Sequence, residues 1–191
     1  MKIAAIWALL LLFPSLSLAE PCKSGFAHEK NFDYMPGAFL PVSLGTFQFD
    51  LPARPERLAS VNGLLAIYSQ GRSISHQPLS KEEVSGDVES IAGSKSSIGD
   101  LYKLIYGITS ESHLGKAQRA RLLELRTSLF GIDCKNAVEI YRINGTPVIF
   151  HETRTPRVFE ILIIHDKLID YIQVKGPKSF ATEILKSIKK R

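Results

Sequence analysis

Residues 137–175 read AVEIYRINGTPVIFHETRTPRVFEILIIHDKLIDYIQVK and contain four short runs rich in Val, Ile, Phe and Tyr. Branched and aromatic side chains pack well on a pleated surface, so runs of this kind are typical of β-strands. Asn144 and Gly145 tolerate the positive φ of a type I′ turn, which predicts a hairpin between the first two runs. The sequence therefore predicts a four-stranded antiparallel meander, with strands at residues 137–143, 147–153, 158–164 and 168–174.

The third run, residues 158–164, is apolar at odd and even positions, apart from Glu160. Successive side chains of a strand point to opposite faces of the sheet. Both faces of this strand are therefore expected to be buried, and other elements should cover the sheet on both sides.

Upstream of the meander the pattern is less regular. Residues 20–44 hold no period and are expected to form an irregular N-terminal arm. Residues 46–51 alternate between apolar and polar side chains and predict a strand. Residues 58–61 and 64–68 flank a second Asn-Gly pair and predict a short hairpin, whereas residues 71–79 are expected to form a loop.

Four helices are predicted from capping residues and from apolar spacing. Ser80 and Glu83 match a capping box at the start of a short helix that ends at Gly93. An apolar stripe from residue 98 to 108 predicts a second helix, and residues 116–130 a third one that stops at Gly131. The fourth helix spans residues 180–191, and its inward side chains are expected to be Phe180, Ile184, Leu185 and Ile188.

These elements together predict an α+β fold. Its mainly antiparallel sheet ends in the meander and carries helices on both faces, as in an α/β/α sandwich. The segment GTFQFDLP at residues 45–52, the helical middle and the meander followed by a helix resemble the order of elements in PsbP-like proteins. That resemblance implies an accessory or binding fold without catalysis. It includes no functional motif, so it assigns no role to any residue.

Residues 1–19 predict a secretory signal peptide. Lys2 precedes an uncharged apolar run, and small residues stand before Glu20 where cleavage is expected. The run is too short to span a membrane. Glu20 and Pro21 argue against a lipid anchor on Cys22. Residues 20–191 are then expected to form one exported domain, in a bacterial periplasm or, as the second option, outside the cell.

Cys22 and Cys134 are the two cysteines of the chain. An oxidising compartment favours a disulfide between them, which would tie the N-terminal arm to the segment before the meander. Such a bond would also remove both thiols from nucleophilic chemistry.

Several classes of function lack the residues that they need. The formal net charge is +5, without the dense basic clusters of a nucleic-acid-binding protein. His28-Glu29 and His151-Glu152 each begin a zinc-protease motif that Phe32 and Thr155 fail to complete. There is no glycine-rich phosphate loop and no G-x-S-x-G nucleophile motif. We therefore expect no metal and no cofactor.

The topology of the meander gives one candidate binding site. Alternate connections of an up-and-down meander lie at the same end of its sheet, and one end should gather four cations without an acid from the meander. Guanidinium groups pair with carboxylates and phosphates, so this cluster could dock an acidic protein, although solvated loop charges would produce the same pattern. The four residues are Lys135, Arg154, Arg157 and Lys175.

Two functions remain open. The sequence favours a non-catalytic exported binding protein, such as an inhibitor, an immunity protein or an envelope accessory factor. The alternative is a small envelope hydrolase whose site combines His113, His151 or His165 with an acid or with Cys134. Active sites are commonly assembled from residues far apart in the chain, so missing local motifs do not exclude an enzyme.

Overall fold

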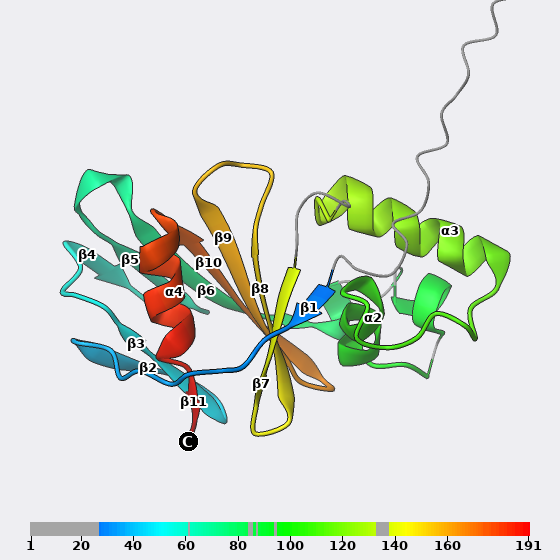
Figure 1. Cartoon of the computed structure of the whole chain (residues 1–191), viewed down its shortest axis with the longest axis horizontal. Coiled ribbons are helices and arrows are strands. Elements are labelled where there is room, and N and C mark those ends of the chain that lie inside the picture. Colours follow the sequence, from blue (N-terminus) through cyan, green and yellow to red (C-terminus); the bar gives the residue numbers. More distant parts are fainter. Residues whose placement is uncertain (1–26, 61, 84–85, 87, 94, 133–137) are drawn as a thin grey trace, which may run out of the picture.

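The computed structural model describes residues 27–60, 62–83, 86, 88–93, 95–132 and 138–191. They form a large eight-stranded sheet, a small three-stranded sheet and several helices (Figure 1). The expected disulfide between Cys22 and Cys134 and the expected signal peptide lie outside these residues. No helix within the described ranges is long and apolar enough to cross a membrane.

The large sheet has the strand order β1-β7-β8-β9-β10-β6-β5-β4, and only the β1–β7 pair is parallel. The small sheet has the order β11-β3-β2 and is antiparallel. The strands of the large sheet are β1 (Ala27–Glu29), β4 (Arg57–Ala59), β5 (Leu64–Ile67), β6 (Ser73–Ser80), β7 (Val138–Ile143), β8 (Thr146–Glu152), β9 (Val158–Ile164) and β10 (Leu168–Lys175). Those of the small sheet are β2 (Leu40–Leu44), β3 (Phe47–Leu51) and β11 (Lys189–Lys190).

The predicted meander is confirmed as β7 to β10. Asn144 has a φ of 51 and Gly145 a φ of 81 degrees. Both values are positive, as a type I′ turn requires. The double-sided burial of β9 is also confirmed, because its side chains divide between two separate cores. Ile161 and Ile163 face one core, whereas Leu162 and Ile164 face the other.

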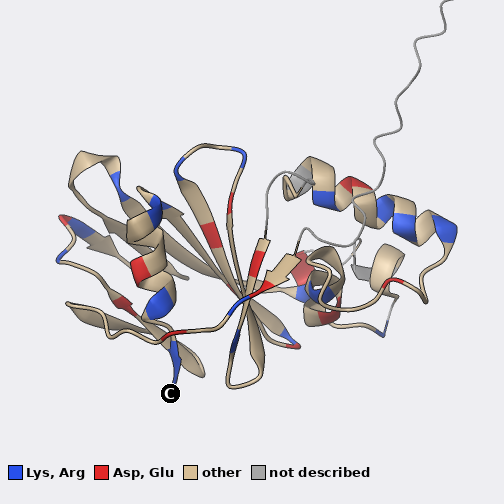
Figure 2. Ribbon diagram, in the orientation of Figure 1, with Lys and Arg blue, Asp and Glu red and all other residues tan. Residues whose placement is uncertain are grey.

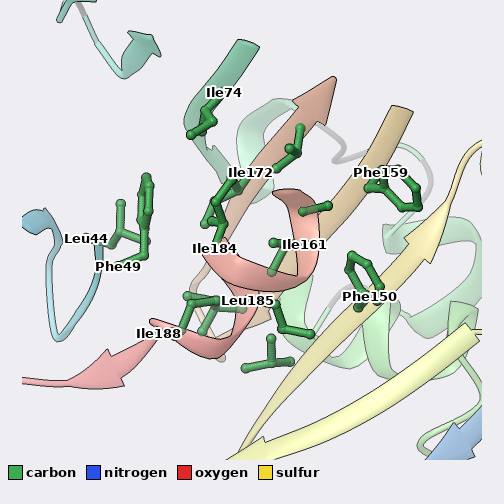
Figure 3. Close-up of a cluster of buried hydrophobic side chains, with 14 of the residues drawn as sticks. Leu44, Phe49, Ile74, Phe150, Phe159, Ile161, Ile172, Ile184, Leu185 and Ile188 are labelled. Carbon is green, nitrogen blue, oxygen red and sulfur yellow. The ribbon is translucent and has the colours of Figure 1, made fainter. Parts of the chain in front are cut away.

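Different elements cover the two faces of the large sheet, which confirms the α+β class with helices on both faces (Figure 1). The first face carries helix α4 (Lys178–Lys186) and the small sheet. Figure 3 shows Ile184 and Leu185 of this helix in one apolar cluster with Ile161 and Phe150 of the large sheet. The second face carries α2 (Ile98–Ile105), α3 (Lys116–Glu124) and η4 (Leu125–Leu129).

The helices α2 and α3 begin where the sequence predicts. The Ser97 hydroxyl accepts a hydrogen bond from the Asp100 N–H, and the Asp100 carboxylate accepts one from the Ser97 N–H, so α2 starts with a capping box. The third predicted helix is α3 continued by η4. Gly131 follows it with a positive φ, the conformation in which glycine commonly ends a helix.

Three predictions upstream of the meander are wrong in part. The expected loop at residues 71–79 holds the last residue of η1 (Ser69–Gly71) and nearly all of β6, which pairs with β10 over eight residues. The expected irregular arm contains β1 and β2. Of the expected helix at residues 80–93, the described part includes η2 (Lys81–Glu83), which is a 3₁₀ turn, and η3 (Val88–Ala92), which is a π-helical turn.

The last helix is shorter than predicted, although all four apolar side chains expected on its inner face are buried. The Ser187 hydroxyl accepts a hydrogen bond from the Asp50 N–H at 2.9 Å and donates one to the Ile184 carbonyl at 2.8 Å. These bonds end the helix at Lys186 and direct the following residues into β11, beside β3.

Candidate functional site

The structure describes three of the four cations that the sequence predicts at one end of the meander. Arg157 lies in the β8–β9 connection, and Lys175 ends β10. The backbone N–H of Gly176 donates to the Arg157 carbonyl at 2.9 Å, so these two cations lie at the same end of the sheet, as predicted. Lys135 falls outside the described residues.

Arg154 belongs to a different contact. Its guanidinium donates a hydrogen bond to the Thr127 carbonyl of η4, and its side chain packs over Gly131. The Arg154 donors are thus turned toward the helical layer, where they hold the β8–β9 connection against η4. The structure therefore does not place the Arg154 guanidinium beside that of Arg157.

Gly176 is the point at which two further cations join Arg157 and Lys175. A Cβ atom on Gly176 would come within 3.4 Å of the Arg72 Cγ and 2.9 Å of the Phe180 Cδ1, so both side chains press against this residue. Lys178 follows two residues later, in the first turn of α4. We call this group the cationic rim, and its members are Arg72, Arg157, Lys175 and Lys178. Figure 2 marks all described lysines and arginines in blue along the ribbon.

Protein contacts hold part of the rim in place. The Arg72 guanidinium lies over the Phe180 ring, 5.2 Å from its centroid, which is the geometry of a cation–π contact. The same guanidinium donates to the Ser69 carbonyl at 3.3 Å. Arg157 has a positive φ, which is uncommon for a residue with a side chain and fixes the turn in a left-handed conformation. Arg157 and Lys175 are both exposed to solvent.

The expectation that no acid of the meander lies at this end is wrong. The Glu152 carboxylate accepts a hydrogen bond from the backbone N–H of Arg157 at 2.9 Å. Lys178 lies 3.3 Å from the Glu139 carboxylate, which Lys30 also contacts at 3.3 Å. Burial alone would raise the pKa of Glu139, but hydrogen bonds from Tyr141 and Lys178 lower it overall, so this carboxylate stays charged. The rim keeps an excess of cations, centred on Arg157 and Lys175.

A second polar group lies on the opposite face of the sheet. His151 Nε2 lies 3.1 Å from a Glu160 oxygen and 3.3 Å from the Tyr106 hydroxyl, and Tyr171 donates to Glu160 at 2.7 Å. Burial, followed by the Glu160 charge, raises the pKa values of Tyr106 and Tyr171 above their usual range and that of Tyr102 to about 12. The three phenols therefore remain protonated donors at neutral pH.

The two nitrogens of His151 already have protein partners. Nε2 contacts Glu160 and Tyr106, and Nδ1 lies 3.3 Å from the Glu152 carbonyl. A general base needs one nitrogen within hydrogen-bond reach of the group from which it takes a proton. His151 is also 4 % exposed, so its present contacts suit a buried structural group.

A third group is built around Asp170 on the α4 face. His76 Nε2 lies 2.9 Å from one Asp170 oxygen, and His165 Nε2 lies 3.1 Å from the other. Asp170 is buried, so its carboxylate needs both partners. Within the described ranges, no three His, Cys, Asp or Glu side chains are arranged to hold a metal ion. His113, the third histidine of the enzyme alternative, is exposed.

Two members of the rim were missed from the sequence. Arg72 lies within residues 71–79, which were expected to form a loop, so nothing placed it beside β10. Lys178 stands after Pro177, and a helix start at Pro177 would have placed it at the same end as Lys175. Comparisons of this chain with protein-family models, curated proteins and solved structures found no match.

Proposed function

We propose that this protein is an exported, non-catalytic binding protein whose cationic rim docks an acidic protein. The main supporting observation is that two exposed cations lie together, because Gly176, which follows Lys175, donates its N–H to the Arg157 carbonyl. Arg72 and Lys178 flank this pair. Export rests on the signal-peptide pattern of residues 1–19. The proposal also fits the accessory function that the PsbP-like order of elements implies.

The chemistry of the rim supports an acidic partner. Arg157 presents a planar guanidinium that can bind a carboxylate with two parallel hydrogen bonds. Lys175 adds a mobile point charge on a flexible stem. Clustered charges of one sign accelerate encounter with an oppositely charged surface and reject surfaces of the same sign. Arg72 is already held by Phe180 and Ser69, so its ordering costs little upon binding.

The rim borders on the N-terminal turn of α4, which strengthens the preference for negative charge. The first backbone N–H groups of a helix lack intrahelical acceptors and carry partial positive charge. Lys178 opens this turn, and Ser179 beside it is exposed. An acidic side chain of the partner would therefore meet the side-chain cations and the helix end at one place.

The test is photo-crosslinking in living bacteria that export the protein. A photoreactive phenylalanine analogue replaces exposed Ser179, beside the rim. We expect one discrete adduct with an acidic protein, identified by mass spectrometry. The pair Arg157→Glu with Lys175→Glu should abolish the adduct, because it reverses both exposed charges while leaving the backbone bond to Gly176 available.

A matched charge reversal controls for the change in net charge. Lys116→Glu with Lys167→Glu alters two exposed lysines, one on α3 and one in the β9–β10 turn at the opposite end of the meander. This control should leave the adduct intact. The proposal fails if no discrete adduct forms, or if the rim pair and the control pair reduce it equally.

A hydrolase is the second candidate, favoured by the contact between His151 and Glu160 at 3.1 Å. An imidazole beside a carboxylate is the base and orienting group of many acyl-transfer sites. The test treats the purified protein with fluorophosphonate and iodoacetamide probes and locates any modified residue. Modification that depends on His151, and disappears in His151→Gln, would favour the enzyme, whereas no modification would favour the binding protein.

A further inference from the structure

An exposed apolar patch lies on the segment that leads into the small sheet. Residues 34–41 read YMPGAFLP and contain no charged side chain. Four large apolar side chains of this segment stay open to solvent, with exposed fractions of 43 % for Tyr34, 46 % for Met35, 48 % for Phe39 and 41 % for Leu40. Large apolar side chains that are exposed this close together in the chain are candidates for an interaction surface. We call these four residues the apolar patch.

Backbone bonds hold this segment on the body of the protein. The Met35 N–H donates to the Lys186 carbonyl at 2.9 Å, and the Phe39 N–H donates to the Leu51 carbonyl at 3.1 Å. Between them, the Gly37 N–H donates to the buried Asp50 carboxylate at 2.9 Å. The backbone is therefore fixed while the large side chains stay exposed, so the folded protein holds the patch in a defined position.

A basic cluster lies beside the patch. It consists of the last four cations of the chain, Lys186, Lys189, Lys190 and Arg191. Lys189 donates to the Tyr34 hydroxyl at 3.0 Å. Its ammonium also lies 5.4 Å from the centroid of the Tyr34 ring, so the patch and the cluster are in contact. Arg191 is fixed through its N–H to the Thr46 carbonyl at 2.9 Å. Two acids adjoin this segment: Asp33 precedes it in the chain and is exposed, and Asp50, which accepts the Gly37 N–H, is buried.

We infer that the apolar patch and the basic cluster together bind the surface of an anionic lipid bilayer. Aromatic and aliphatic side chains can enter the boundary between headgroups and acyl chains, and tyrosine and phenylalanine suit this boundary well. Adjacent lysines are attracted to anionic headgroups as point charges. Three of the four cations are lysine, a residue that is depleted in protein–protein interfaces, so the composition favours a lipid surface over a protein.

This inference is independent of the proposed partner site. The cationic rim adjoins the first turn of α4, whereas the basic cluster begins at Lys186, the last residue of the same helix. The full length of this helix, more than two turns, therefore separates the two sites. If the protein attaches to the membrane through the patch, Arg157 and Lys175 lie at the other end of α4, away from the lipid surface.

The test is co-sedimentation of the full exported chain with lipid vesicles. One set contains equal parts of phosphatidylglycerol and phosphatidylcholine, and the other contains phosphatidylcholine alone. We expect binding to the anionic set, weaker binding to the neutral set, and loss of the difference at high salt, because salt screens the lysines. Phe39→Ser with Leu40→Ser should weaken binding to anionic vesicles by about tenfold or more. Lys190→Glu with Arg191→Glu should do so as well, but only for anionic vesicles.

Matched variants elsewhere on the surface test whether vesicle binding depends on the patch and the basic cluster in particular. Leu58→Ser with Leu65→Ser changes two leucines of similar exposure, 49 % and 43 %, on the β4–β5 hairpin, and should leave vesicle binding unchanged. Arg157→Glu with Lys175→Glu should change it by less than about twofold, because these charges lie outside the contact. Residues 20–191 contain no tryptophan, so Phe39→Trp supplies the sole one in the exported chain, and its emission should shift to shorter wavelength with vesicles. Circular dichroism confirms that each variant folds.

Three outcomes would overturn the inference. The first is that the native chain stays in the supernatant with both sets of vesicles. The second is that substitution of Phe39 and Leu40 leaves the binding unchanged. The third is that the native chain does not bind vesicles but self-associates in sedimentation velocity, and that the Phe39 and Leu40 variant loses this self-association. That result would assign the patch to contact with a second copy of the protein. None of these outcomes bears on the photo-crosslink at Ser179.

Discussion

The backbone N–H of Gly176 donates to the carbonyl oxygen of Arg157 at 2.9 Å, and this bond joins the end of β10 to the β8–β9 connection. It brings together two cations at the ends of different strands. Arg157 stands just before β9, and Lys175 is the last residue of β10. Arg72 and Phe180 press against the same glycine, so the cationic rim depends on a residue without a side chain.

Gly176→Ala should therefore lower both stability and partner binding. The added methyl group would lie 2.9 Å from a ring carbon of Phe180, and the positive φ disfavours any side chain. We expect the free energy of unfolding to fall by about 1–3 kcal/mol, measured by urea denaturation. An alanine variant as stable as the native chain would show that the contacts at Gly176 are looser than described.

Substitution of Arg154 should mainly lower stability, and substitution of Arg157 should mainly lower partner capture, although the sequence places both residues in one cluster. Arg154→Ala removes the hydrogen bond to the Thr127 carbonyl. It should lower the free energy of unfolding by about 1 kcal/mol, with little change in partner capture. Arg157→Ala keeps the backbone bonds and should reduce capture with a smaller loss of stability. Denaturation and photo-crosslinking of both variants check this division. Equal effects on capture would restore the cluster that the sequence predicts.

Asp170 should make the stability of the protein depend on pH in the acid range. Burial alone would raise the pKa of its carboxyl, but hydrogen bonds from His165 and His76 outweigh burial and lower it below the usual 3.8. A carboxyl with a lowered pKa in the folded state stabilises the protein above its unfolded pKa. That contribution is lost as the pH falls through the folded value.

Asp170→Asn should thus cost about 1–3 kcal/mol at neutral pH. The difference from the native chain should shrink as the pH falls below 3.8 and through the lowered folded pKa, and urea denaturation over a series of pH values measures it. Asp166→Asn changes an exposed neighbour with one contact to Lys103 and serves as the control. It should cost about 1 kcal/mol or less. A penalty for Asp170→Asn that is the same at neutral and acid pH would contradict this account.

Ser187 should be required for the attachment of the small sheet. Its fully buried hydroxyl accepts from the Asp50 N–H and donates to the Ile184 carbonyl, so Ser187→Ala leaves the Asp50 N–H without this acceptor. We expect a loss of about 1–3 kcal/mol, together with faster amide exchange in β11 and β3. Ser187→Thr keeps the hydroxyl and should keep the slow exchange if the extra methyl group fits. Unchanged exchange in the alanine variant would show that β11 is held by other contacts.

The fold could be predicted from the sequence wherever a local pattern was strong. The meander, its Asn144-Gly145 turn and the start of α2 at its apolar stripe all follow from neighbouring residues. Strand β6 could not be predicted in this way, because Ser73–Ser80 contains two large apolar residues, Ile74 and Leu79, and also Pro78. Its eight-residue pairing with β10 is a tertiary effect. Pro78 is tolerated because β5 begins at Leu64, opposite His76, and so has no residue opposite Pro78 that requires the missing N–H on that side.

The candidate site shows the same division. Lys175 and Arg157 could be placed at one end from strand direction alone. Arg154 points toward η4 because it bonds to the Thr127 carbonyl, and the sequence does not place Thr127 near the β8–β9 connection. Arg72 reaches the rim because β6 is a strand, and that strand was not predicted. Glu152 could have been found, since it stands two residues before Arg154 at the end of its strand.

The most direct measurement is the dissociation constant for the captured acidic partner at low and high ionic strength. It would be determined for the native chain, for Arg157→Glu with Lys175→Glu, and for Lys116→Glu with Lys167→Glu. We predict tight binding that weakens as salt rises for the native chain and the control pair, because salt screens exposed charges. The rim pair should lose about tenfold or more at low salt. Equal affinities for all three proteins, with the same dependence on salt, would contradict the claim that the cationic rim binds the partner.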